Sequence, residues 1–121
     1  MIGIGIDAVD IARMREVMTR TPKFAQRVFT KEEIAALAER EDPTPSYAAR
    51  FAAREAVMKA LGVGLGAFDL RDVSVERTSS GEPRLVLRGR AEQLARERGI
   101  NKWFLSLTHT ESVAMAMVTA E

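Results

Sequence analysis

Short runs in which apolar residues alternate with small or polar residues predict β-strands in this chain. Ile and Gly alternate over residues 2–6, directly before Asp7. Later runs of the same kind lie at residues 73–75, 85–87, 103–107 and 113–118. The turn-forming sequence Ser79-Ser80-Gly81-Glu82-Pro83 separates the first two of these later runs, which predicts a β-hairpin.

Capping residues and apolar residues at helical spacing predict two helices in the first third of the chain. Asp10 can cap a helix that ends near Arg20, because its carboxylate can accept from the first free N–H groups of the helix. Thr30 and Glu33 have the spacing of a capping box, which predicts a second helix to about Arg40.

A longer helix is predicted over residues 46–61, and a shorter one over residues 89–98. The sequence Glu41-Asp42-Pro43-Thr44-Pro45 separates the long helix from the one before it, since proline disfavours helix in the preceding residue. Gly62 is placed to end the long helix, because glycine adopts the left-handed conformation of a C-cap without strain.

The long helix is apolar on two sides. Its large apolar residues are Tyr47, Phe51, Val57, Met58 and Leu61, and the opposite side carries Ala49, Ala53, Ala56 and Ala60. A helix of this kind is usually buried on both sides. The order of elements, βαααββαββ, therefore predicts one compact α+β domain over residues 1–121, with antiparallel strands and a long buried helix.

The charged residues of this helix fall at two edges, and spacing alone leaves their interpretation open. Glu55 and Lys59 are spaced i,i+4 with the acid first, as in an ordinary surface ion pair. Alternatively, a helix buried on two sides keeps charges only where something is bound. Arg50 and Arg54, at the other edge, would then suit a phosphate because a guanidinium presents several donors in one plane.

Composition excludes several classes of function. The 18 basic and 17 acidic residues give a net charge of +1, and with sparse aromatic residues this argues against nucleic-acid binding. The absence of cysteine excludes disulfides, thiolate metal sites and a cysteine nucleophile. No apolar run approaches the roughly 20 residues that span a bilayer, and the N-terminus lacks a signal-peptide layout. We therefore expect a cytoplasmic protein.

Three segments resemble the AcpS-type phosphopantetheinyl transferases in order and spacing. They are Ile4-Gly5-Ile6-Asp7, the segment FAAREAVMKALG from Phe51 to Gly62, and the segment LSLTHT from Leu105 to Thr110. The resemblance covers nearly the whole chain, including Gly81-Glu82-Pro83 of the hairpin. It implies the family's fold and its reaction, in which phosphopantetheine moves from coenzyme A to a serine of an apo acyl carrier protein in fatty acid biosynthesis.

The resemblance implies a magnesium-dependent active site. Asp7 and Glu55 match the family's two protein ligands of the metal, in agreement with the preference of Mg²⁺ for one or two carboxylates plus phosphate oxygens. Asp7 alone has the alternative interpretation of a helix-initiating acid. Glu55, directly or through a metal-bound water, is a candidate base for the serine proton, and another carboxylate remains an alternative. Lys59 would hold the pyrophosphate or protonate the departing phosphate.

The resemblance also implies contacts with coenzyme A. Arg50 and His109, the only histidine, match family residues at the coenzyme phosphates, although a lone histidine is more often structural. Weaker candidates for nucleotide contact are Gly62, Pro83, Ser106, Thr108 and Thr110. The family commonly has lysine in place of Arg54, which leaves the role of Arg54 open, since arginine and lysine are not equivalent at a tightly fitted position.

A basic surface is predicted on the first helix. Arg13 and Arg20 are seven residues apart and share a face, and Lys23 and Arg27 continue its basic character. By itself this pattern is equally typical of a solvated face. The resemblance makes it the docking surface for the acyl carrier protein, a small acidic partner, with charges that steer association.

The resemblance further implies a homotrimer with active sites between subunits. The two charged edges of the long helix support this, since Glu55 and Lys59 can serve one site while Arg50 reaches the next. Two other functions remain alternatives: a transferase that serves carrier domains of large synthases, and a catalytically silent scaffold that binds coenzyme A. Retention of Asp7, Glu55 and Lys59 argues against the scaffold.

Overall fold

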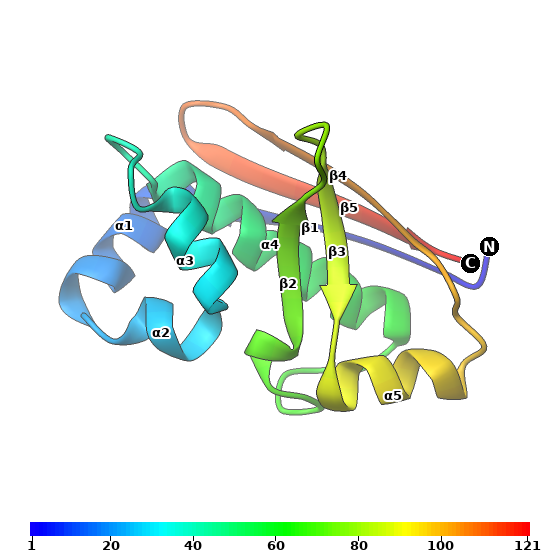
Figure 1. Ribbon diagram of the computed structural model, residues 1–121. Helices are drawn as coiled ribbons and strands as arrows, with labels where there is room; N and C mark the ends of the chain where they lie inside the picture. Colours follow the sequence, from blue (N-terminus) through cyan, green and yellow to red (C-terminus); the bar gives the residue numbers. More distant parts are fainter.

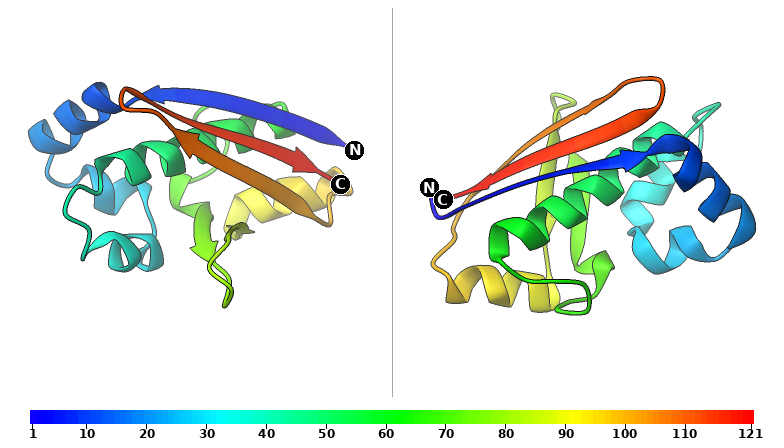
Figure 2. Two further views of the ribbon diagram at one scale, coloured as in Figure 1. Left: turned by 90° about the horizontal axis from the view of Figure 1, so that it is seen from above. Right: turned by 180° about the vertical axis from the view of Figure 1, so that it is seen from behind.

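In the computed structural model, which describes residues 1–121, a three-stranded sheet and a β-hairpin enclose one long helix (Figure 1). The helix is α4 (Thr44–Leu61). The antiparallel sheet has the order β1 (Gly3–Asp10), β5 (Val113–Ala120), β4 (Trp103–His109), and the hairpin pairs β2 (Val73–Arg77) with β3 (Pro83–Leu87). The two further views show α4 along the inner face of the sheet (Figure 2). The predicted α+β domain with antiparallel strands is confirmed.

Shorter helices cover the ends of this arrangement. They are α1 (Ile11–Arg20), α2 (Phe24–Val28), α3 (Lys31–Leu37), the 3-10 helix η1 (Leu70–Asp72) and α5 (Gly89–Glu97). The predicted cap of α1 is confirmed, because Asp10 Oδ1 accepts from the Arg13 N–H at 3.1 Å. The capping box of Thr30 and Glu33 at the start of α3 is confirmed as well.

Several predicted boundaries were wrong. The helix predicted to about Arg40 ends at Leu37, and the long helix begins at Thr44 rather than at 46. Pro45 lies in the first turn of α4, where its missing N–H would have had no partner in the helix. The short helices α2 and η1 were not predicted, because one or two turns carry too little periodicity to be recognised.

The alternating glycines of β1 allow the strand to lie directly on α4. A Cβ on Gly5 would lie 1.8 Å from the carbonyl oxygen of Ala56, and one on Gly3 would lie 2.4 Å from that of Ala60. The backbones therefore meet where only glycine fits. Because side chains alternate along a strand, the isoleucines of β1 point away from the helix.

Burial of α4 on both sides is confirmed. Ala52, Ala53, Ala56 and Val57 are completely buried, and Met58 and Leu61 nearly so, in the largest core cluster. This core joins the inner face of the sheet to the hairpin and to α5. No helix in the structure has both the length and the apolar character that a membrane span requires.

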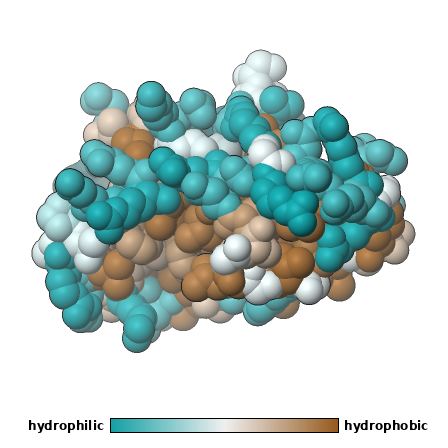
Figure 3. Space-filling view, turned by 90° about the horizontal axis from the view of Figure 1, so that it is seen from below, coloured by the Kyte–Doolittle hydropathy of each residue, from teal (hydrophilic) through white to brown (hydrophobic).

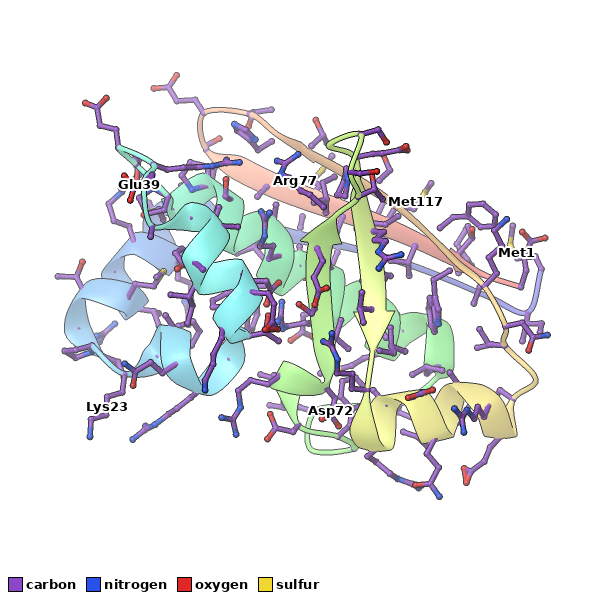
Figure 4. The ribbon with its side chains drawn as sticks, in the orientation of Figure 1. Met1, Lys23, Glu39, Asp72, Arg77 and Met117 are labelled. Atoms are coloured by element: carbon purple, nitrogen blue, oxygen red, sulfur yellow. The ribbon has the colours of Figure 1, made fainter.

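The outer face of the three-stranded sheet has no covering layer. It exposes large apolar side chains from all three strands, namely Ile4, Ile6, Phe104, Met115 and Met117, each at least 39% accessible. Met117 is among the labelled side chains (Figure 4). Seen from below, apolar surface lies mainly in the lower half of the view and hydrophilic side chains in the upper half (Figure 3). We name the five outward residues the outer apolar face; a contiguous face of this kind is typical of an interaction surface.

Candidate active site

Asp7 and Glu55 come together at the free edge of β1. Asp7 lies in the middle of this strand, opposite Ala116, rather than at the strand end as predicted. Its side chain points to the same side as Gly5, toward α4, where Glu55 is half-buried. Burial raises the pKa of Glu55, the charge of Asp7 raises it further, and Lys59 opposes this shift. Two carboxylates from distant parts of the sequence therefore converge, as predicted.

Lys59 is held against β1 by two hydrogen bonds. Its Nζ donates to the carbonyl oxygen of Ile6 at 2.8 Å and to Asp7 Oδ1 at 3.2 Å. The surface ion pair with Glu55, one of the two interpretations of the i,i+4 spacing, is absent, because the ammonium pairs with Asp7. More than half of the Lys59 side chain stays accessible. The three residues thus form an open site with one cation and two carboxylates.

Arg50 lies at the other edge of α4 and is only 3% accessible. One of its Nη atoms donates to the carbonyl oxygen of Ser46 at 3.3 Å, and its Nε has no partner. Burial lowers the pKa of Arg50; Glu33 opposes this shift, and Arg40, Arg77 and Arg54 add to it. Positive charge therefore accumulates around Arg50, as in a site for an anion.

The phosphate-binding hypothesis for Arg54 was wrong. Its side chain is completely buried, and both Nη atoms donate to the carboxylate of Glu33. Nε donates to the carbonyl oxygen of Leu70 at 2.9 Å, and the guanidinium carbon lies 4.8 Å from the centre of the Phe29 ring. With these partners Arg54 connects α3, α4 and η1, and its complete burial keeps it out of reach of a ligand. Its role is structural.

His109 and Thr110 lie at the end of β4, near the N-terminus of α4. They border a surface cavity of about 540 Å³ whose other lining residues are Ile11, Arg15, Asp42, Pro45 and Glu111. Arg15 donates to both carboxylate oxygens of Asp42, at 2.9 and 3.0 Å, and this lowers the pKa of Asp42 to about 2. Sequence analysis missed the pair, because 27 residues separate its members.

The remaining coenzyme candidates do not form one group within a single chain. Gly62 ends α4 in the left-handed conformation, one turn beyond Lys59. Pro83 begins β3 opposite Arg77, whereas Ser106 and Thr108 lie on β4, where they alternate with the inward side chains. Lys59 and Gly62 thus lie at one end of α4, and Arg50 and His109 lie toward the other.

Arg13 and Arg20 are both exposed on α1, which directly follows β1. Arg20 pairs with Glu16 at 2.8 Å, whereas the Arg13 side chain has no ion pair. Beside them lie the partly buried Met18, Phe24 and Phe51, none of which sequence analysis assigned to a docking surface. Their signal was weak, because isolated apolar residues next to basic ones are common on helices.

The amino-acid sequence of this chain is similar to those of known proteins over almost its whole length. Residues 3–118 match the sequence model of the 4'-phosphopantetheinyl transferase superfamily. The chain is 45% identical to the holo-[acyl-carrier-protein] synthase of Moorella thermoacetica over 100% of its length and 94% of that protein. It is 42% identical to the holo-[acyl-carrier-protein] synthase of Treponema denticola, with coverage of 100% and 98%.

Solved structures that share this fold carry the same name as the sequence relatives. The holo-[acyl-carrier-protein] synthase of Neisseria meningitidis is 33% identical, with a TM-score of 0.90 and coverage of 100% of this chain and 99% of that one. The Helicobacter pylori enzyme in complex with coenzyme A is 29% identical, with a TM-score of 0.84 and coverage of 98% and 99%. The resemblance found in the sequence motifs is confirmed over the whole fold. This chain belongs to the 4'-phosphopantetheinyl transferase superfamily.

Proposed function

We propose that this chain is a holo-[acyl-carrier-protein] synthase, which transfers phosphopantetheine from coenzyme A to a serine of an apo acyl carrier protein. The observation that carries the proposal is the convergence of Asp7, Glu55 and Lys59 at one open edge of the sheet. The full-length relatives with this name and the coenzyme A complex of the Helicobacter pylori enzyme support the same reaction.

A Mg²⁺ ion suits the pair of carboxylates. Burial and the neighbouring charge of Asp7 raise the pKa of Glu55, so two carboxylates lie close together with one nearby ammonium, that of Lys59. The structure has no cluster of three or more acidic, histidine or cysteine ligands. Mg²⁺ is commonly held by one or two carboxylates and completes its shell with water and substrate phosphate. Asp7 and Glu55 would hold the ion, which when bound neutralises charge on the pyrophosphate.

The protein's own groups account for the proton transfers of the reaction. The serine oxygen forms a bond to the β-phosphorus of coenzyme A, and the bond from that phosphorus to the oxygen of the departing adenosine bisphosphate breaks. Glu55 accepts the serine proton as the general base. The ammonium of Lys59 donates hydrogen bonds to the phosphate oxygens and can supply a proton to the departing phosphate.

Assembly into a trimer would complete the site. The outer apolar face exposes enough large side chains to support contact between copies of the chain. Arg50, with Arg40 and Arg77 nearby, lies at the edge of α4 opposite Glu55 and has a buried donor without a partner. In a homotrimer these arginines would hold the nucleotide phosphates in the active site of the neighbouring chain. His109 and Thr110, at the same end of α4, would contribute there too.

The acyl carrier protein would dock on α1. Arg13 is free of ion pairs, and Arg20, Lys23 and Arg27 add positive charge on the same side of the molecule. The partly buried Met18, Phe24 and Phe51 offer apolar contact between these charges. Because α1 follows β1 directly, a partner docked on it presents its serine near Asp7. A cytoplasmic location agrees with the absence of cysteine and with the partner.

Mass spectrometry of the acceptor tests the proposal. An apo acyl carrier protein is incubated with coenzyme A, Mg²⁺ and this protein, and in parallel an excised carrier domain of a large synthase is treated in the same way. The mass of the discrete carrier protein should rise by one phosphopantetheine, and fragmentation should place it on serine. An unchanged mass for both acceptors would overturn the proposal, whereas modification of the domain alone would redirect it to large synthases.

A further inference from the structure

We infer that Lys59 acts as an internal counter-cation for Asp7 that opposes metal binding until coenzyme A draws it away. The inference rests on the proposed function, because it concerns the same carboxylate pair. It makes the binding of metal and of coenzyme A mutually favourable through a residue of the protein, in addition to any direct contact between the two ligands.

The contacts of Lys59 show that the ammonium is bound to β1. Both of its acceptors, the Ile6 carbonyl and Asp7 Oδ1, belong to this strand, and neither belongs to Glu55 one turn earlier on the same helix. Asp7 is four-fifths buried at its side chain and has no other hydrogen-bond donor than Lys59. The ammonium is therefore the one protein group that compensates this carboxylate.

A divalent ion and an ammonium on the same carboxylate repel each other. At separations of 4–6 Å near a protein surface, this repulsion weakens metal binding by about tenfold or more. Lys59 is on a flexible stem, and over half of its side chain is accessible, so it can leave Asp7 if another anion is within reach. The pyrophosphate of coenzyme A is such an anion, and it would also supply the oxygen ligands that two carboxylates leave missing.

Metal binding in the absence of coenzyme A tests this inference without any activity measurement. Free Mn²⁺ is measured by electron paramagnetic resonance during titration of the wild type, Lys59→Met and Lys59→Gln. Lys31→Met is the matched control, because the exposed Lys31 side chain on α3 has no ion pair and its loss changes the net charge equally. Glu55→Gln identifies the site that is titrated.

Removal of the Lys59 charge should tighten Mn²⁺ binding by about tenfold in both lysine variants. Lys31→Met should match the wild type, and Glu55→Gln should bind more weakly. If Lys59→Met and Lys59→Gln bind Mn²⁺ no tighter than Lys31→Met while Glu55→Gln loses binding, the inference is overturned and the metal site stands. If Glu55→Gln binds as the wild type does, the metal site itself is wrong, and the inference falls with it.

Discussion

The guanidinium of Arg54 and the carboxylate of Glu33 form an ion pair without solvent access, between α4 and α3. Glu33 accepts further hydrogen bonds from the backbone N–H groups of Thr30 and Val75, so the pair also connects β2. Every side-chain nitrogen and oxygen of the two residues has at least one hydrogen-bond partner. This network fixes the hairpin and α3 against the helix that carries Glu55 and Lys59.

Removal of one member of this pair should destabilise the fold strongly. Arg54→Met leaves the Glu33 carboxylate buried without its counter-charge, and breaking a buried pair in this way costs about 3–5 kcal/mol. Urea unfolding measures the free energy of unfolding. The control is Arg15→Met, which breaks an exposed pair with Asp42 and should cost no more than about 1 kcal/mol. Equal losses in the two variants would show that burial of the pair is not what matters.

Glu55→Gln should abolish transfer and at the same time stabilise the metal-free protein at neutral pH. Because the pKa of Glu55 is raised in the folded state, ionised Glu55 disfavours folding. Below its ordinary pKa of 4.5, Glu55 is protonated in both states, and the effect vanishes. The gain in melting temperature of the variant should therefore appear as the pH rises through 4.5 and persist at pH 7. A lower melting temperature than that of the wild type at pH 7 would contradict this account.

Substitution on the outer apolar face should prevent assembly. Met117→Glu places a charge among the exposed apolar side chains of β5 and should give monomers that lack transferase activity. Light scattering after gel filtration measures the mass. The control is Leu65→Glu, which alters an exposed apolar residue in the loop after α4, away from the sheet. If Met117→Glu keeps the oligomeric state of the wild type, the outer apolar face is not the interface.

Charge reversal on α1 should affect the carrier protein rather than coenzyme A. Arg13→Glu should raise the KM for the carrier protein about tenfold or more and leave the KM for coenzyme A nearly unchanged. Arg20→Glu should have a smaller effect, because Arg20 already pairs with Glu16. Arg98→Glu at the end of α5, far from α1 in Figure 1, is the matched control. A change confined to the KM for coenzyme A would show that the carrier protein does not dock on α1.

Local signals in the sequence were sufficient for much of the fold. The caps at Asp10 and Thr30 and the glycine stop at Gly62 depend on neighbouring residues, and all were predicted. Which side chains of β1 face the core was not predicted, because a strand with alternating Ile and Gly can turn either set of residues toward the helix. Only the approach of Gly5 to the backbone of Ala56 makes glycine the inward residue.

The sequence motifs identified which residues belong to the candidate site, but they did not predict which charged residues pair across long sequence separations. Asp7 and Glu55 converge as expected. Lys59, however, pairs with Asp7 rather than with its helical neighbour Glu55, because β1 lies beside Lys59. Arg54 was predicted to suit a phosphate because a guanidinium presents several donors in one plane, whereas its partner Glu33, 21 residues earlier, was predicted only as part of a capping box. That carboxylate serves both purposes, which spacing within one helix cannot reveal.

The central claim, that each active site combines Glu55 of one chain with Arg50 of another, is tested most directly by complementation. Arg50→Met keeps the buried stem and removes the guanidinium, and Glu55→Gln removes the carboxylate, so each protein should be inactive alone. The two are mixed, dissociated in urea and reassembled, and native mass spectrometry verifies that mixed assemblies form.

The account predicts recovered transfer to the carrier protein in the mixture, because some sites then pair an intact Glu55 with an intact Arg50 from the adjacent chain. Each variant carried alone through the same urea treatment should remain inactive. Verified mixed assemblies without recovered activity would show that every chain builds its site from its own residues, which would contradict the account.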